Sequence, residues 1–340
     1  MRKLAGGIVL GAMTAVALPA AGAELPGEGK TVQPARATWD TGWFQAEIYI
    51  KALEELGYDV RAPKTLDNPP FYQAVAQGDV DFWVNGWFPL HNTYEAEFGR
   101  GASLVGYVAK GGALQGYLVD KKTADANDIT SIEDFKKPEI RKLFDANGDG
   151  LADLVACPPG WGCELVIEHQ LEAYELTDAV KPIKASYAAS MADAIGRFQQ
   201  GQPIFFYTWT PNWTVGLLKP GEDVVWIETP FASLPEDQKQ FEDQTTVASV
   251  EGCVADPCDM GWPANDIRPV ANNQFLEENP AARALFEEIS IPLEDIFAQN
   301  AKMFEGEDSK QDIVRHAEEW IAANRETFDG WIETAKQATM

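Results

Sequence analysis

The chain has 340 residues, with 27 basic and 53 acidic side chains and a net charge of −26. Its 45% hydrophobic and 24% charged content is ordinary for a globular protein of one or two domains and excludes a disordered chain. Because so much negative charge repels phosphate groups, the charge argues against nucleic acid or anionic lipid as the main partner.

The N-terminus has the order of a secretory signal peptide. Arg2 and Lys3 precede an apolar run at 4–18, and small residues follow it. Residues 1–23 are therefore predicted to be cleaved, and we expect no lipid anchor because no cysteine follows the cleavage site. No later stretch reaches eighteen apolar residues, so we expect no direct membrane insertion and a mature chain that is free in a periplasm.

Extended and helical segments alternate along the mature chain, which predicts a largely parallel α/β sheet. The first part is expected to contain strands at 31–38, 58–62 and 80–84 and helices at 42–56 and 71–77. The second part repeats this order, with strands near 114–119, 154–156, 204–207 and 224–227 and helices at 164–176 and 188–199. From 280 to 336 the pattern is that of amphipathic helix, with breaks around Gly306 and Gly330.

Two segments of the chain share one pattern. At 78–89 and at 201–211 a glycine ends a helix, an apolar strand follows, and Trp-x-Pro comes next. This internal echo predicts two lobes of similar construction, each of which places a tryptophan, Trp87 or Trp209, where a strand leaves the sheet.

Four of the eleven tryptophans are predicted to meet where open α/β sheets bind ligands, outside the carboxyl ends of the strands. Besides Trp87 and Trp209 they are Trp43, in the first turn of the first helix, and Trp161, in a loop between a strand and a helix. Indole faces desolvate and attract a cation that cannot donate hydrogen bonds, and each contact contributes about 2 kcal/mol at best. The expected guest of such a cage is a trimethylammonium group.

Polar groups for the rest of the ligand are predicted beside Trp161. Gly162 and Cys163 open a helix whose first N–H groups are free to bind an anion. His91, four residues after Trp87, is a candidate third donor, with a purely structural role as the alternative. His169 and His316 lie within helical segments and are interpreted as structural.

The four cysteines fall in two close pairs, Cys157 with Cys163 and Cys253 with Cys258. In an exported chain this spacing indicates two short-loop disulfides. Zinc is the alternative, which the lack of a nearby histidine disfavours.

The segment 145–153 matches a calcium-binding loop at positions one, three, five and nine, with glycine at position six and a backbone carbonyl at seven. Position twelve lacks the usual bidentate glutamate, so another ligand or water must complete the shell. We predict a structural calcium ion that braces the loop before Trp161, with a solvated acidic turn as the alternative. The expected ligands are Asp145, Asn147, Asp149, Leu151 and Asp153.

The sequence contains no nucleophile paired with a base, no H-E-x-x-H pair, no phosphate-binding glycine loop and no serine elbow. The chain is therefore not expected to be an enzyme. A periplasmic enzyme that acts on methylated amines and a ligand-sensing partner of a receptor are the alternatives from other classes.

Five motifs carry a resemblance to a known family: GWFPLH (86–91), QGYLVDKKTA (115–124), KLFDANGDG (142–150), PGWGCE (159–164) and YTWTP (207–211). With them the chain resembles, over nearly its whole mature length, periplasmic substrate-binding proteins of ABC importers for glycine betaine and proline betaine. The resemblance implies a two-lobed type II periplasmic binding protein fold, α/β with mixed sheets flanked by helices and two crossing strands at the hinge. The expected boundaries are 24–114 and 228–340 for lobe I and 115–227 for lobe II, and the expected partners are a small zwitterionic osmolyte and ABC permease and ATPase subunits.

The resemblance also implies roles for single residues. The ammonium group would be boxed by Trp87, Trp161 and Trp209. The carboxylate would be held by His91 and by the backbone amides of Gly162 and Cys163, with Cys157 bonded to Cys163.

The chain departs from the betaine-binding pattern at Trp43 and in the insertion that holds Cys253 and Cys258. Better-known members of the family carry a small polar residue where this chain has Trp43. A fourth tryptophan is similar to the arrangement in members that bind trimethylamine N-oxide (TMAO). We therefore rank TMAO first as the expected ligand, glycine betaine or proline betaine second, and dimethylsulfoniopropionate third.

Overall fold

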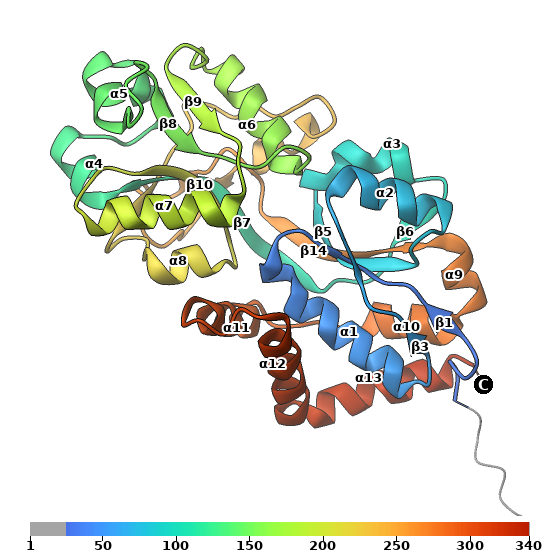
Figure 1. Ribbon diagram of the computed structural model, residues 1–340. Helices are drawn as coiled ribbons and strands as arrows, with labels where there is room; N and C mark the ends of the chain where they lie inside the picture. Colours follow the sequence, from blue (N-terminus) through green and yellow to red (C-terminus); the bar gives the residue numbers. More distant parts are fainter. Residues whose placement is uncertain (1–24, 340) are drawn as a thin grey trace, which may run out of the picture.

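The computed structural model describes residues 25–339, and the predicted signal peptide lies outside the described residues. Residues 25–339 form two α/β lobes side by side (Figure 1), with helices flanking mixed sheets as predicted. The long strand β7 (Ala109–Asp120) belongs to both lobes. Its first part pairs with β14 (Asn265–Asn272) and its second part with β10 (Phe205–Thr210), and the change of partner falls between Ala113 and Leu114.

Lobe I is built on the antiparallel pair β5 (Phe82–Phe88) and β14. On its far side the short strand β2 (Ala35–Ala37) runs parallel to β4 (Lys64–Leu66), and a parallel bridge from Pro34 reaches β5. The remaining strands of this lobe are β1 (Thr31–Val32), β3 (Asp59–Val60) and β6 (Ala102–Leu104). Its helices are α1 (Trp43–Glu55), α2 (Asn68–Gln77), α3 (Glu95–Phe98), α9 (Asn273–Glu278), α10 (Pro280–Glu288), α12 (Lys310–Ala323) and α13 (Arg325–Gln337).

Lobe II has β7 at its centre. Both β10 and β11 (Val224–Ile227) pair with β7 in antiparallel fashion, and β8 (Ala152–Val155) and β9 (Val180–Ile183) continue the sheet in parallel. The sheet is therefore mixed, and it is not the largely parallel sheet that the alternation of segments predicts. The reason is that β7, which crosses between the lobes, runs antiparallel to both β10 and β11. Its helices are α4 (Lys121–Asn127), α5 (Pro138–Phe144), α6 (Gly162–Ala173), α7 (Tyr187–Gln199) and α8 (Trp213–Leu217).

The segment that follows β11 stays with lobe II, whereas the predicted boundary returned it to lobe I at residue 228. Its ends are tied there: the N–H of Glu228 donates to the carbonyl of Thr130, and Gln170 on α6 donates to the carbonyl of Gly261. The chain re-enters lobe I on β14. The elements of this segment are η4 (Lys239–Gln244), β12 (Thr246–Val247) and β13 (Cys258–Asp259).

Both predicted disulfides are confirmed. Cys157 is bonded to Cys163 at the start of α6, and Cys253 to Cys258 in the segment between β11 and β14. The first one ties the loop that carries Trp161 to the helix that follows it.

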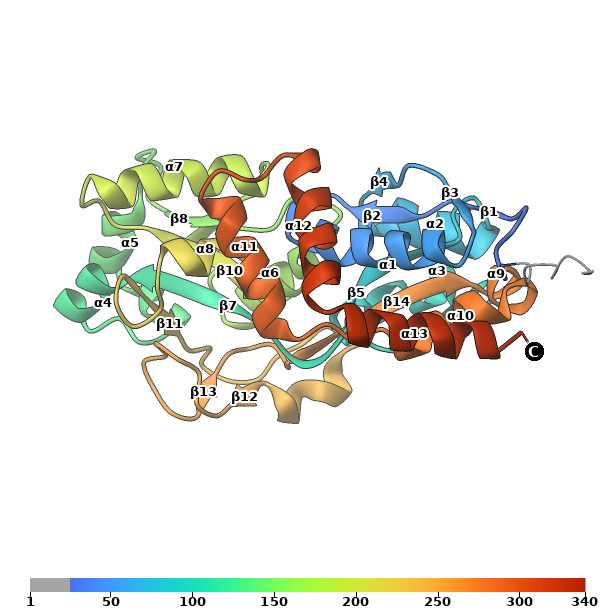
Figure 2. The same cartoon turned by 90° about the horizontal axis from the view of Figure 1, so that it is seen from below.

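The C-terminal helices cross from one lobe to the other, as Figure 2 shows from below. Helix α11 (Leu293–Phe304) packs against α8 of lobe II, whereas α12 packs against α1 of lobe I. The expected break near Gly306 lies between α11 and α12, but α13 continues through Gly330, because a glycine in open space weakens a helix without ending it.

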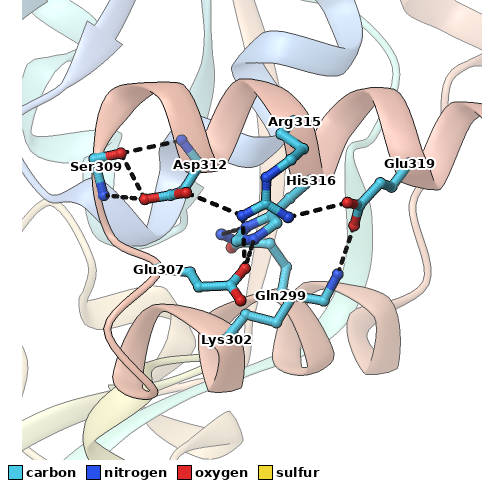
Figure 3. Close-up of polar contacts among 8 residues, drawn as sticks. All are labelled: Gln299, Lys302, Glu307, Ser309, Asp312, Arg315, His316 and Glu319. Carbon is cyan, nitrogen blue, oxygen red and sulfur yellow. Dashed lines mark hydrogen bonds and ion pairs between the residues drawn. The ribbon is translucent and has the colours of Figure 1, made fainter.

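Polar contacts join α11 to α12 (Figure 3). His316 is buried between these helices, with its Nε2 2.7 Å from a Glu307 carboxylate oxygen. Lys302 of α11 pairs with Glu319 of α12 at 3.0 Å. His316 thus has the structural role predicted for it.

Within residues 25–339, no helix combines the length and the apolar character needed to span a bilayer.

Candidate functional site

A cavity lies where the two lobes meet. The space between its side chains is about 310 Å³, its opening to solvent included. Six of the seven predicted site residues line it: Trp87, His91, Trp161, Gly162, Cys163 and Trp209. Five further lining residues were not predicted: Trp39, Asn68, Leu90, Gln115 and Tyr207.

The cavity has four indole rings in its wall, each at most 8% exposed. The ring centroids of Trp39 and Trp161 are 5.2 Å apart at an interplanar angle of 69°, and those of Trp161 and Trp209 are 5.6 Å apart at 72°. Edge-to-face contacts of this kind turn successive ring faces in different directions, as in the sides of a box. Trp39 and Trp87 come from lobe I, and Trp161 and Trp209 come from lobe II.

The strand ends place two of these rings. β5 does not stop at Asn85 but continues to Phe88, because β14 pairs with it up to that residue. Trp87 and Trp209 are therefore the next-to-last residues of β5 and β10 and not the residues after them. The predicted meeting place, at the carboxyl ends of the strands, is where the cavity lies.

Trp43 does not belong to the cavity, and its predicted place in the cage is wrong. Its indole N–H donates to the carbonyl of Ala37 at 2.7 Å, and the guanidinium of Arg36 stacks 3.7 Å from its ring centroid. The reason is a 3-10 turn at Asp40–Gly42, which separates the end of β2 from the start of α1. Trp39 lies between the end of β2 and this turn, and it supplies the fourth ring.

The polar end of the cavity is the beginning of α6. The helix has no side-chain cap, and within residues 25–339 the N–H groups of Gly162 and Cys163 have no acceptor. A Cβ atom at Gly162 would lie 3.1 Å from Leu90 and 3.2 Å from His91, so glycine lets the two lobes approach closely here. Free N–H groups at a helix N-terminus form an anion-binding site.

His91 also faces this end, and its protonation state follows from its neighbours. The N–H of Trp87 donates to Nδ1 at 3.2 Å, so the ring proton is on Nε2. Burial lowers the pKa of His91 to about 3, so the ring is neutral. Nε2 lies within hydrogen-bond distance of the side-chain amide of Asn68, at 3.1 Å. Both ring nitrogens of His91 are thus held by groups of lobe I.

A hydrogen-bond relay joins the lobes beside the cavity. The indole N–H of Trp161 donates to the hydroxyl of Thr38 at 3.1 Å, and this hydroxyl donates to the Asp67 carboxylate at 2.5 Å. Thr38 and Asp67 belong to lobe I and Trp161 to lobe II. The relay therefore holds one wall of the cavity in place only when the lobes are closed.

The acidic loop at 145–153 lies away from the cavity. The carboxylate of Asp145 accepts hydrogen bonds from the N–H groups of Gly148 and Gly150, and Asp149 pairs with Lys181. In the part of the chain that the structure describes, no group of three or more His, Cys, Asp or Glu side chains is arranged to hold a metal ion. Calcium binding by this loop stays a prediction.

Comparison with known proteins places the chain in a family. Residues 30–323 match the substrate binding domain of ABC-type glycine betaine transport systems. The chain belongs to this family. Its fold is shared with a lactococcal protein whose structure is closed and complexed with glycine betaine, at a TM-score of 0.67 and 21% identity over 89% of this chain and 99% of that one.

Relatives with named ligands agree with this family. Glycine betaine/proline betaine-binding periplasmic proteins of Salmonella typhimurium and Escherichia coli are 44% and 46% identical, over 96% and 93% of this chain and of their own lengths. A trimethylamine N-oxide-binding protein of Pelagibacter ubique is 23% identical over 85% of this chain and 87% of its own. The chain is thus a substrate-binding protein of an ABC importer for glycine betaine-type osmolytes and not an enzyme. Proteins of this class work with permease and ATPase subunits.

Proposed function

We propose that the protein captures glycine betaine or proline betaine in the periplasm and delivers it to an ABC permease. The observation that carries this proposal is the pairing, in one small cavity, of four indole rings with the free N–H groups of Gly162 and Cys163. A betaine has a methylated ammonium group for the rings and a carboxylate for the N–H groups. In this arrangement the ammonium lies among Trp39, Trp87, Trp161 and Trp209.

The number of donors favours a carboxylate over an N-oxide. The free donors at this end of the cavity are the two backbone N–H groups at the start of α6, from Gly162 and Cys163. A carboxylate offers one oxygen to each of these N–H groups, whereas an N-oxide presents a single oxygen. Donors left without an acceptor in a buried site would each cost about 1–3 kcal/mol.

The ranking of TMAO first rested on Trp43, which lies outside the cavity. Trp39 restores a fourth ring, but additional aromatic surface serves any trimethylammonium group, whatever its anionic end. The relatives that are 44% and 46% identical carry betaine in their names, and the TMAO-binding relative is 23% identical. These points together support the betaines over TMAO.

Calorimetric titration of the mature protein tests the proposal. We expect glycine betaine and proline betaine to bind with micromolar dissociation constants, about −8 kcal/mol, and TMAO and dimethylsulfoniopropionate at least tenfold more weakly. If TMAO bound most tightly, the proposal would be wrong.

A further inference from the structure

Gln115 is a cavity residue whose amide is satisfied at one end only. It lies on β7 directly after the crossing between the lobes, opposite Trp209 of β10, and is 1% exposed. The hydroxyl of Tyr207 donates to its Oε1 at 2.5 Å. Its Nε2 has no partner anywhere in residues 25–339.

Because this hydrogen bond uses the amide oxygen of Gln115, its Nε2 remains available to a ligand in the cavity. The amide oxygen of Gln115 faces the hydroxyl of Tyr207, and burial raises the pKa of Tyr207 well above its ordinary value, so a protonated hydroxyl donates to this oxygen. The amide is thereby held with its oxygen against Tyr207, and the NH₂ group is the end left without a partner.

A second buried glutamine provides the contrast. Gln170 accepts a hydrogen bond from the hydroxyl of Tyr117 at 2.8 Å and donates one to the carbonyl of Gly261 at 2.8 Å. Both ends of its amide are satisfied by protein, as is the rule for buried polar groups. The unpaired nitrogen of Gln115 therefore needs a reason, and its place in the cavity wall offers one.

We propose that Gln115 is a specificity-determining residue, whose NH₂ group donates a hydrogen bond to an anionic oxygen of the ligand. Through it the cavity selects methylated ammonium compounds that carry an oxyanion over those that end in a hydroxyl, because hydrogen bonds to ionised acceptors are about twice as strong as neutral ones. The inference rests on the proposed function and adds a residue and a criterion of selection to it. Tyr207 acts through Gln115 as a positioning residue.

The test measures the affinities of the full mature chain for glycine betaine and for choline, by quenching of tryptophan fluorescence up to the millimolar range. For Gln115→Met we expect the affinity for glycine betaine to fall at least tenfold and that for choline less than threefold. Gln115→Glu is nearly isosteric and keeps an oxygen for Tyr207, but it turns a carboxylate oxygen toward the ligand. We expect it to lose more glycine betaine affinity than the Met variant and to bind choline more tightly than the wild type does.

Two further variants separate this role from a structural one. Tyr207→Phe should weaken glycine betaine binding by less than Gln115→Met, and the double variant should bind like Gln115→Met alone, since the hydroxyl acts only through the amide. Gln170→Met is the matched control outside the cavity, and it should alter melting without changing the ratio of the two affinities.

The outcomes that overturn the inference are distinct from failure of the proposed function. A wild-type protein that binds no betaine would refute the proposed function itself. A wild type that binds glycine betaine, with a Gln115→Met variant whose two affinities are unchanged or fall by the same factor, would refute only the role of Gln115.

Discussion

The cavity and the acidic loop at 145–153 were both predicted to bind a ligand, and they differ in how their polar groups are satisfied. In the cavity, donors of Gly162, Cys163 and Gln115 lack acceptors within the described chain. In the loop, acceptors such as the Asp145 carboxylate already have donors from the loop's own backbone. An unpaired buried donor costs free energy until a ligand supplies the acceptor, whereas a satisfied carboxylate needs no cation to hold its loop together. The two regions therefore depend on their ligands to different degrees.

Trp161→Ala should have the largest effect on the cavity. Trp161 contacts both Trp39 and Trp209, and one desolvated cation–π contact is worth about 2 kcal/mol, so we expect the affinity for glycine betaine to fall about thirtyfold in calorimetry. Trp43→Phe is the matched control and should change affinity less than twofold. Equal losses in the two variants would mean that Trp43 belongs to the cage after all.

Because of His91, the free energy of unfolding should depend on pH, whereas the affinity for the ligand should not. Its pKa is about 3 in the folded protein because of burial, against about 6.5 when unfolded. Its contribution to stability is therefore complete above pH 6.5 and is lost as the pH falls from there toward 3, by up to about 1.4 kcal/mol per pH unit. Denaturant unfolding at several pH values should show this loss in the wild type and in His169→Gln, but not in His91→Gln.

The same neutral ring makes a prediction for the ligand. Because His91 carries no charge above pH 4 or so, the affinity for glycine betaine should stay constant between pH 5.5 and 8. An affinity that rises as the pH falls through 6.5 would show that a histidinium holds the carboxylate, contrary to the tautomer assigned from the N–H of Trp87.

Thr38→Val should have a moderate effect on the rate of ligand release. The substitution removes the hydroxyl that links the indole N–H of Trp161 to Asp67 across the lobes, so the closed state loses one contact. Stopped-flow fluorescence should record glycine betaine leaving three to ten times faster with little change in association. Thr38→Ser retains the hydroxyl and should behave like the wild type; slow release from the Val variant would argue against the relay.

The loop at 145–153 should give the smallest effect. Calcium bound as its spacing predicts would be retained at about one equivalent after dialysis, and chelation would lower the melting temperature by a few degrees without changing the affinity for glycine betaine. Metal analysis that finds no calcium, with melting unchanged by a chelator, would end the calcium prediction.

Sequence reasoning located most of the cavity because strand ends and the helix after a Gly-Trp-Gly loop are readable from local pattern. It chose Trp43 over Trp39 because it placed the ligand at the first turn of the helix that follows the strand at 31–38, and it did not anticipate the 3-10 turn at Asp40–Gly42. A signal was present: Trp39 directly follows the end of that strand, the criterion that selected Trp87 and Trp209.

Other features depend on contacts between distant segments. Gln115 and Tyr207 reach the cavity because β7 pairs with β10 in a particular register, which no local pattern specifies. The segment after β11 stays with lobe II through hydrogen bonds such as that from Gln170 on α6 to Gly261, 91 residues away. Both features are set by contacts between segments that lie far apart in the sequence.

A crystal structure of the complex with glycine betaine tests the central claim most directly. The account predicts the trimethylammonium group among Trp39, Trp87, Trp161 and Trp209, with carboxylate oxygens within about 3.2 Å of the backbone nitrogens of Gly162 and Cys163. A ligand bound the other way round, with its methyl groups against the start of α6, or bound outside this cavity, would contradict it.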